Sequence, residues 1–484
     1  MNEIRAPHMK LHPSIIFAGS MKKIITMLLI SGIYLILHQN YIMTLSVNVR
    51  GIIVASMLLS IGRSYFFWKN FSYCFDGGHL IINNGIWFKN KRSIAINRIS
   101  NMDVRVSLWQ RIFGVAELRL DTEGGEREAL IKLAAVNHSE VKRIKAIINY
   151  QESENAIAWQ LKPSSIIYYG LTTMKLGYLC SFILFVYFQL DFIRDSRNVI
   201  ALEKSLSAIE PTMRIAIYTT LLLTLSILLS VFFAFFRFHR FRVLMHDQSL
   251  QIKSGLVNTH TVTINRDNIA AIRIEESLLR QPFQVCTVYL DCVSGGNEEE
   301  SSSTILIPWV SKKALAPLLQ NYFPNFDFSV LERKLDDTSL KLYRAPARSF
   351  LSFSLIKLTA GFCIWLILGQ FVMLQSYMTM MAAAAFLVVI LWSYLQYKDH
   401  AISLTNLGQL SFSTRFIHKK TIFIRKNSLQ QISFHRSFIQ KLSNLTTIAF
   451  IVRTSAFRKN HRVRHLGNHS ISLVSKWFST DDNQ

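Results

Sequence analysis

The chain has 484 residues, of which 50% are apolar and 17% are charged, and its formal net charge at neutral pH is +24. This composition is too apolar for a water-soluble globular protein of this length, so it argues against that class and favours a membrane protein. The five cysteines are odd in number and show no C-x-x-C spacing, which favours reduced structural thiols over a disulfide framework.

Apolar stretches long enough to cross a bilayer, about 20 residues each, occur in three pairs along the chain. These stretches are residues 24–37, 49–68, 176–190, 215–236, 356–374 and 378–397. Lys22, Lys175 and Lys357 lie at or near the start of the first stretch of each pair, where a long side chain can extend to the headgroups. The sequence therefore predicts six transmembrane helices.

The basic residues around these stretches predict their orientation. The connectors at 38–48 and 375–377 contain no Lys or Arg, whereas Lys69, Arg237 and Lys398 lie at the opposite ends of the helices. Because Lys and Arg are enriched on the cytoplasmic side, both termini and all long polar segments are expected in the cytoplasm. No cleavable signal peptide is recognisable at the start of the chain.

Three polar segments follow the helix pairs and repeat one another. They align without a gap, at a shift of 170 residues from the first to the second and of 160 from the second to the third. Shared columns hold Leu80, Leu250 and Leu410; Ile94, Ile264 and Ile424; and Ser107, Ser277 and Ser437. A proline also precedes each helix pair, at Pro13, Pro163 and Pro346. One unit, consisting of a proline, two helices and a polar domain, is therefore present three times.

Within a polar segment the apolar residues mostly alternate, which is typical of half-buried strands. Leu80 and Ile82 alternate ahead of a turn that ends at Gly85. A helix is expected at the end of each segment, most clearly at 137–150, where Asn137 and Glu140 have capping-box spacing. Several antiparallel strands closed by one helix predict a small barrel or two-sheet domain of roughly 80 residues.

Four of these elements resemble the type 2 bacterial pleckstrin-homology-like (PH-like) domain. They are the strand that ends in Gly85 and Gly255, the S-I-x-I-x-R-I strand at 93–99, the S-L-x-Q-R-x-x-G stretch at 107–114, and the late strand at 131–136. Three such domains on paired helices are similar to YdbT-type membrane proteins, and the resemblance covers most of the chain.

The resemblance implies a multi-span α-helical membrane protein with small β domains. Each of three repeats would consist of two transmembrane helices followed by a PH-like β-barrel or sandwich with a C-terminal helix. The helix pairs are expected at 11–70, 161–240 and 344–397, and the PH-like domains at 71–150, 241–325 and 398–480. The implied location is the bacterial inner membrane, and the implied context is the cell envelope and tolerance of membrane-active peptides.

The third repeat departs from the pattern at two turns. Arg415 stands in the column of Gly85 and Gly255, and Asn444 stands in the column of Gly114. If those glycines adopt positive φ, another residue there costs on the order of 1 kcal/mol. A loosened turn is therefore expected in the third domain.

Charge separates the third repeat from the other two. Residues 72–150 carry 12 basic and 8 acidic residues, residues 241–325 carry 7 and 8, and residues 398–484 carry 14 and 3, so the net charges are +4, −1 and +11. Positive-inside topology enriches cytoplasmic Lys and Arg, but it does not explain why acidic residues are absent from 400–480. The candidate site for anionic lipid headgroups or an acidic partner is Lys419, Lys420, Arg425, Lys426, Arg453, Arg458, Lys459, Arg462 and Arg464. Ordinary solvated surfaces also carry such residues, although they mix both signs.

No catalytic or metal site is predicted, and no cofactor is expected. His461, His465 and His469 are four residues apart, but the arginines among them would repel a cation and Gly467 argues against a helix. No Gly-rich phosphate loop, nucleophile elbow or H-E-x-x-H motif occurs.

The favoured function is a non-enzymatic membrane scaffold that binds lipid headgroups, its own domains or a protein partner. The expected partners are anionic membrane lipids and either a small companion membrane protein with one PH-like domain or a second copy of the chain. The acidic run at 298–300 is an alternative docking site for the basic third domain. Nucleic acid is not expected, because the domain has no stacking motif. The rival hypothesis is a component of a transporter or channel.

Overall fold

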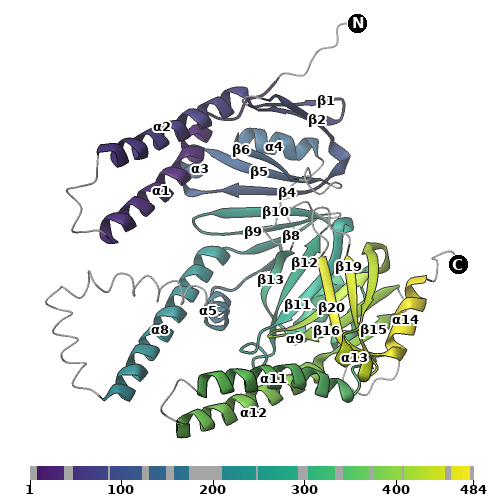
Figure 1. Cartoon of the computed structure of the whole chain (residues 1–484). Helices are drawn as coiled ribbons and strands as arrows, with labels where there is room; N and C mark the ends of the chain where they lie inside the picture. The colour runs from purple at the N-terminus through teal and green to yellow at the C-terminus, as the bar shows by residue number, and fades with distance from the viewer. Residues whose placement is uncertain are drawn as a thin grey trace. The chain divides into compact units, whose positions relative to one another are not determined.

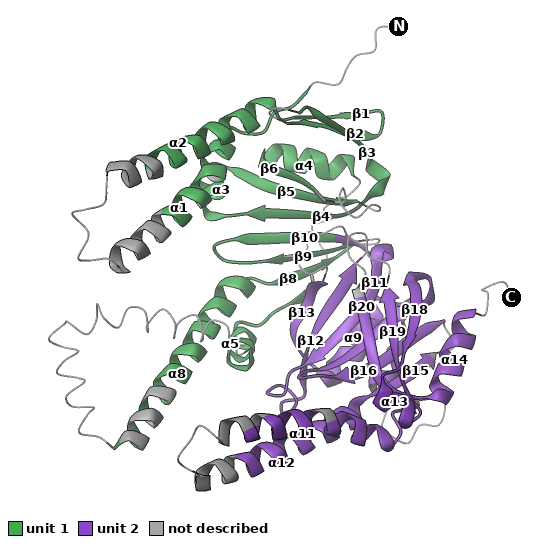
Figure 2. Ribbon diagram, in the orientation of Figure 1, with its two compact units in different colours: residues 1–122, 130–263 green, residues 123–129, 264–484 purple. Residues whose placement is uncertain are grey.

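The computed structural model describes residues 8–37, 47–85, 88–122, 130–148, 157–173, 210–246, 249–292, 303–332, 342–369, 375–405, 408–452 and 459–479. Long helices alternate there with antiparallel strands (Figure 1). The chain divides into two compact units, one formed by residues 1–122 and 130–263 and the other by residues 123–129 and 264–484 (Figure 2).

The helices that precede the polar segments pack against each other in pairs within each unit. Their bounds are α1 Ser14–Leu37, α2 Val47–Asn70, α5 Pro163–Thr172, α8 Pro211–Phe238, α11 Arg348–Gly369 and α12 Gln375–Asp399. In the first unit α5 lies directly against α8: the hydroxyl of Ser230 on α8 donates to the carbonyl oxygen of Gly170 on α5 at 2.8 Å. In the second unit the ammonium of Lys357 on α11 donates to the hydroxyl of Ser393 on α12 at 3.2 Å.

The prediction of six transmembrane helices in three pairs is wrong as a description of this structure. Among the described residues, only Thr220–Phe238 is long and apolar enough to cross a membrane. The six-helix prediction allowed charged residues inside the helices. Helix α1 contains Lys22 and Lys23, and helix α11 contains Lys357 well inside its ends. Such charges raise the cost of placing a helix in hydrocarbon. The apolar stretch at 176–190 lies outside the described residues.

The first unit contains two antiparallel sheets. One has the order β1-β2-β3, and the other has the order β6-β5-β4-β10-β9-β8-β7. The strand bounds are β1 Ser72–Asp76, β2 His79–Asn84, β3 Asn90–Ala95, β4 Ile99–Val106, β5 Val115–Thr122, β6 Leu130–Asn137, β7 Ile157–Gln160, β8 Arg242–Met245, β9 Ser249–Ser254 and β10 Thr259–Asn265.

The second unit repeats this plan. A seven-stranded sheet has the order β13-β12-β11-β17-β16-β15-β14, and a three-stranded sheet has the order β18-β19-β20. The strand bounds are β11 Ile269–Glu276, β12 Val285–Cys292, β13 Ser303–Ser311, β14 Leu342–Arg344, β15 Ala401–Thr405, β16 Gln409–Arg415, β17 Lys419–Arg425, β18 Leu429–His435, β19 Leu445–Val452 and β20 Lys459–Gly467.

Consecutive repeats share sheets, so the expected self-contained domain is not what forms. In the second unit β11–β13 of the second repeat continue into β14–β17, which belong to the third repeat and the segment before it. The expected single strand at 93–99 is in fact two strands, because the 3-10 turn Ile96–Arg98 separates β3 from β4. The same turn recurs at Arg266–Asn268 and Lys426–Ser428 and directs the chain from one sheet to another.

A short strand before each helical segment pairs with the first strand after it. Met9 bridges to Tyr73, β7 pairs with β8, and β14 pairs with β15. Alternation could not reveal these strands, since they are only a few residues long. As a result, the two ends of each helical segment meet in one sheet.

The core of each repeat draws on both of its sheets and on its last helix. In the first repeat Leu80 of β2, Met102 of β4 and Ile144 of α4 (His138–Ile147) are fully buried in one cluster. Helices α9 Lys312–Tyr322 and α14 Asn468–Ser479 end the other repeats. The expected capping box at Asn137 is absent, because the Asn137 side chain makes no cap hydrogen bond. Capping boxes form instead at Ser107 with Gln110 and at Ser437 with Gln440, at the starts of α3 Leu108–Ile112 and α13 Phe438–Leu442.

The expected loosened turn in the third repeat is absent at Arg415. Gly85 and Gly255 adopt φ of +125° and +108°, and a Cβ on Gly255 would lie 2.0 Å from the Asn258 carbonyl oxygen. Arg415 instead is the last residue of strand β16 and lies opposite Lys419. Strand β16 therefore extends one column further than β9, and no residue with positive φ is needed at this column. Asn444 does adopt a positive φ of +49°, as its column predicts.

Candidate functional site

The structure distributes the predicted basic site over two sheets. Lys419, Lys420 and Arg425 lie on β17, and Lys426 follows directly in the 3-10 turn. Lys459, Arg462 and Arg464 lie on β20 of the three-stranded sheet. Arg453 and Arg458 lie outside the described residues, as do the acidic residues at 298–300. The nine residues are therefore not one continuous strip of cations.

The cations of β17 are already engaged within the second unit. The Lys419 ammonium lies 3.2 Å from the Asp399 carboxylate, and the Lys420 ammonium lies 3.0 Å from that of Glu275. Lys420 is directly opposite Glu275 in the antiparallel register of β11 and β17. Lys420 therefore joins the third repeat to the second one, whereas the pair of Lys419 and Asp399 lies within the third repeat.

Arg425 lies at the other end of β17 and is also engaged within the second unit. Its guanidinium lies 4.7 Å from the centre of the Phe326 ring and donates to the Ile269 carbonyl oxygen at 3.1 Å. Burial lowers the pKa of Arg425, and the negative charge of Asp267 opposes that effect. Arg425 is therefore half-buried in the joint between β11 and β17.

Arg462 and Arg464 remain as the exposed part of the predicted site. They alternate with Val463, which is fully buried, so both guanidinium groups lie on the outer face of β20. Within the described part of the chain neither of them forms an ion pair, whereas Lys419 and Lys420 both do.

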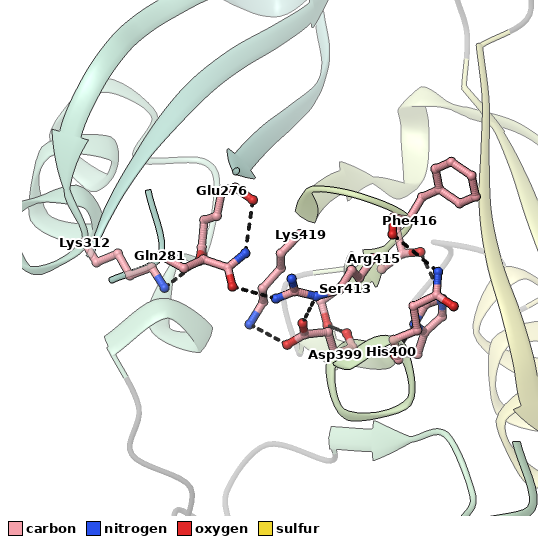
Figure 3. A network of polar contacts seen from close by, with 11 residues as sticks. Glu276, Gln281, Lys312, Asp399, His400, Ser413, Arg415, Phe416 and Lys419 are labelled. Atoms are coloured by element: carbon pink, nitrogen blue, oxygen red, sulfur yellow. Dashed lines mark hydrogen bonds and ion pairs between the residues drawn. The ribbon is translucent and has the colours of Figure 1, made fainter. Parts of the chain in front are cut away.

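A polar network links the second repeat to the third around the buried side chain of Arg415 (Figure 3). The Arg415 guanidinium contacts the Asp399 carboxylate and donates to the Gln281 side-chain oxygen at 2.9 Å. Gln281 donates in turn to the carbonyl oxygen of Glu276, whose carboxylate lies 2.6 Å from the Lys312 ammonium. The network therefore connects the ends of α12 and β16 with the end of β11 and the start of α9.

A second buried contact joins Asp291 on β12 to His461 on β20. Asp291 is fully buried, and one of its carboxylate oxygens lies 3.3 Å from His461 Nε2. The other oxygen lies 3.9 Å from the Arg273 guanidinium. His461 was considered as a metal ligand and disfavoured; it contacts a carboxylate of the second repeat instead, and the described residues contain no group of three side chains suited to a metal.

Two further histidines are buried around one ring. Phe353 of α11 lies 4.8 Å from the ring of His400 and 4.3 Å from that of His465. Burial lowers the pKa of both imidazoles to about 4, so both are neutral at neutral pH. They therefore form part of the core and do not contribute to the positive surface.

Asp399 and Asp291 were not predicted from the sequence as site residues, and Arg415 was named there only for its position at a turn. One signal was available, because Asp399 is the only acidic residue between Asp337 and Asp481. A lone carboxylate among so many cations is a natural ion-pair partner, but its location opposite Arg415 depends on the fold.

The arrangement favours association over catalysis. Cys286 is the most deeply buried of the described thiols, and burial raises its pKa to about 12, so it is not an activated nucleophile. The polar clusters pair carboxylates with basic or histidine side chains, within the third repeat at Asp399 and Arg415 and between repeats at Glu275 and Lys420 and at Asp291 and His461.

Comparisons with known proteins agree with the repeat. A family model described as a bacterial PH domain matches residues 24–152, 189–322 and 358–476. The UPF0699 transmembrane protein YdbT of Bacillus subtilis (strain 168) is 27% identical over 446 residues, an alignment that covers 87% of this chain and 87% of that protein.

Proposed function

Because the chain belongs to the bacterial PH domain family, we propose that it is a non-enzymatic scaffold at a membrane, whose sheet domains bind anionic lipid headgroups. The sequence-based prediction of three bacterial PH-like domains in a YdbT-type protein is confirmed. The similar protein from Bacillus subtilis is named a transmembrane protein, and the apolar stretch Thr220–Phe238 is consistent with membrane attachment here.

The strand pairings support placing the sheets of each unit on one side of the membrane. Since β7 pairs with β8, both ends of the segment that contains α5 and α8 lie in one sheet. They therefore lie on the same side of any membrane that α8 enters. The Lys and Arg residues at the ends of the helices favour the cytoplasmic side, in a bacterial inner membrane.

The short helix α3, which has exposed apolar side chains, lies close to the end of the apolar stretch Thr220–Phe238 in the first unit. Leu256 N donates to the Phe236 carbonyl oxygen at 3.0 Å, and Arg111 of α3 contacts the Leu256 carbonyl oxygen at 3.3 Å. Beside Arg111, Trp109 is 44% exposed and Ile112 is 70% exposed. Aromatic and aliphatic side chains next to a cation at this level suit the interface between headgroups and hydrocarbon.

The observation that carries the lipid proposal is the pair Arg462 and Arg464. Both face solvent on β20, and the third repeat around them has 14 basic and 3 acidic residues. A cation near an anionic surface contributes about 1 kcal/mol. These two arginines therefore replace the nine-residue site as the proposed headgroup contact within the described residues.

The test is a titration of the detergent-solubilised full chain with fluorescent phosphatidylglycerol. Two reversals, Arg462→Glu and Arg464→Glu, should weaken binding by roughly 30-fold at low salt, at about 1 kcal/mol per cation. Binding should also weaken as salt rises, because the Debye length falls from about 10 Å at 0.1 M to about 3 Å at 1 M.

The matched control reverses Lys132 and Lys142, two exposed lysines of the first unit. These reversals change the net charge by the same amount and should alter phosphatidylglycerol binding by less than about twofold, if contact and not net charge matters. Equal losses in both double variants, or equal binding of phosphatidylcholine, would contradict the proposal.

A further inference from the structure

Sheets continue from one repeat to the next by a fixed rule. The second half of a repeat, as in β4–β6 or β11–β13, joins the first half of the following repeat. The joining strands are β4 with β10 in the first unit and β11 with β17 in the second unit. Each joint therefore needs one strand from either side of the 3-10 turn.

Two of the described strands occupy joining positions but have no such neighbour among the described strands. By the repeat shifts, β3 is the counterpart of β10 and β17, and β18 is the counterpart of β4 and β11. Among the described strands β3 is hydrogen-bonded only to β2, and β18 only to β19. The first and the third repeat thus each present one open sheet edge.

Burial in matched columns shows that the β3 edge is uncovered. The middle residues of β17, Ile422, Phe423 and Ile424, are at most 2% exposed where β11 covers them. The corresponding residues of β3 are Arg92, Ser93 and Ile94; Ser93 is exposed and the other two are half-buried. The same column position is therefore buried when a neighbouring strand is present and open in β3.

The β18 edge shows the same contrast. Ala270 and Ala271 of β11 are fully buried beside β17, whereas the matched Gln430 and Gln431 of β18 are exposed. Phe434 of β18 is 42% exposed, although the matched Ile274 is 2% exposed. An apolar side chain on an open strand edge invites pairing with another strand.

The completed joints indicate the charge of the missing strand. At both completed joints a carboxylate of one repeat meets a nitrogen of the next: Asp103 lies 2.8 Å from His260, and Glu275 lies 3.0 Å from Lys420. The open edge of β3 is basic, with Lys91 and Arg92, whereas β18 contains no Lys, Arg, Asp or Glu. The strand that complements β3 should therefore carry acidic residues.

A second copy of this chain fits poorly. If β18 paired with β3 in the register of β11 and β17, Arg436 would lie opposite Lys89, and Phe434 would lie opposite Lys91. Like charges directly opposite one another destabilise a strand pair. This pairing therefore lacks the opposite charges that face each other where β11 meets β17.

We propose that β3 and β18 are docking edges for a different polypeptide, one that contains a repeat of this kind with acidic residues on the strand that joins β3. A first-half sheet would extend the sheet at β18, and a second-half sheet would extend the sheet at β3. One repeat contains both halves, so a partner with a single PH-like domain has the required parts. This interaction is separate from the proposed binding of lipid.

The test is photocrosslinking of the full chain in the native cell. A benzoylphenylalanine is placed at Ser93 on β3 or at Gln431 on β18, both exposed, and at Lys142 on the outer face of α4 as the control. Mass spectrometry of the crosslinked peptides should identify a PH-like repeat of another protein at both edges but not at Lys142, and the strand crosslinked at Ser93 should be acidic.

Charge provides the matched variants. Lys91→Glu with Arg92→Glu should lower the crosslink at Ser93 at least tenfold, whereas Lys91→Arg with Arg92→Lys should leave it unchanged. Three results would overturn the proposal: crosslinks to a differently tagged second copy of this chain, the same products at Lys142, and no crosslink at either edge. The last of these would mean that basic residues protect β3 as an unpaired edge.

Discussion

Replacement of Asp399 by Asn should destabilise the second unit by about 3–5 kcal/mol, the cost of removing one partner of a buried ion pair. The Arg415 side chain is 4% exposed, and Asp399 is its carboxylate partner. In the variant, Arg415 keeps only its 2.9 Å hydrogen bond to Gln281 among these contacts, so a buried guanidinium loses its counter-charge. At 2–4 °C per kcal/mol for a unit of this size, the unfolding temperature should fall by roughly 6–20 °C.

A double-mutant cycle measures this coupling directly. Calorimetry of the full chain in detergent gives the unfolding temperature, and hydrogen exchange at β16 and β17 assigns the transition to the second unit. The variant that combines Asp399→Asn with Arg415→Gln should lose less than the sum of the two single variants, because the buried charge that needs a partner is gone.

The matched control is the more exposed pair of Glu275 and Lys420, with side-chain exposures of 18% and 36%. Its coupling should be about 0.2–1 kcal/mol. If the Asp399 and Arg415 substitutions prove additive, or if both pairs couple equally, the assignment of Asp399 and Arg415 as a strongly coupled buried ion pair is refuted.

Two further outcomes are expected. Acidification from pH 6.5 to pH 4 should destabilise the second unit, because the unfolded chain protonates His400 and His465 near pH 6.5 while burial holds both pKa values at about 4 in the folded state; stability is therefore present above pH 6.5 and is lost as the pH falls, by about 3 kcal/mol for His400. Unfolding curves of His400→Gln should show a weaker pH dependence than those of an exposed control, His138→Gln, and equal slopes would count against this account. A reporter that is active only outside the cytoplasm should stay silent when fused after Gln484 or inserted near Ser294, and activity at either place would refute the proposed orientation.

The family, the threefold repeat and the charge of the third repeat can be inferred from the sequence, because each depends only on which residues occur and in what order along the chain. Matched columns such as Leu80, Leu250 and Leu410 are a comparison along one chain, and all three of these leucines are fully buried. The acid-free stretch after His400 is likewise a matter of counting. No knowledge of strand neighbours is needed for either inference.

The neighbours of each strand were decided only by the tertiary structure. Alternation shows that 93–99 is extended, but it does not show that a 3-10 turn at Ile96–Arg98 sends its two halves to different sheets. An apolar stretch, likewise, does not by itself show that a helix crosses a membrane, and the six-span prediction failed because helices such as α1 and α11 contain charged residues well inside their ends.

The fate of the positive charge was also decided by the fold. Composition indicated an excess of positive charge on the third repeat. In the structure Lys419 is paired with Asp399 at the end of α12, and Lys420 is paired with Glu275 through the register of β11 and β17. The energy of a charge depends on its distance from other charges and on the surrounding dielectric. Both quantities belong to the folded arrangement, so residue counts determine how much charge a repeat carries and only the structure determines how much of it remains for a ligand.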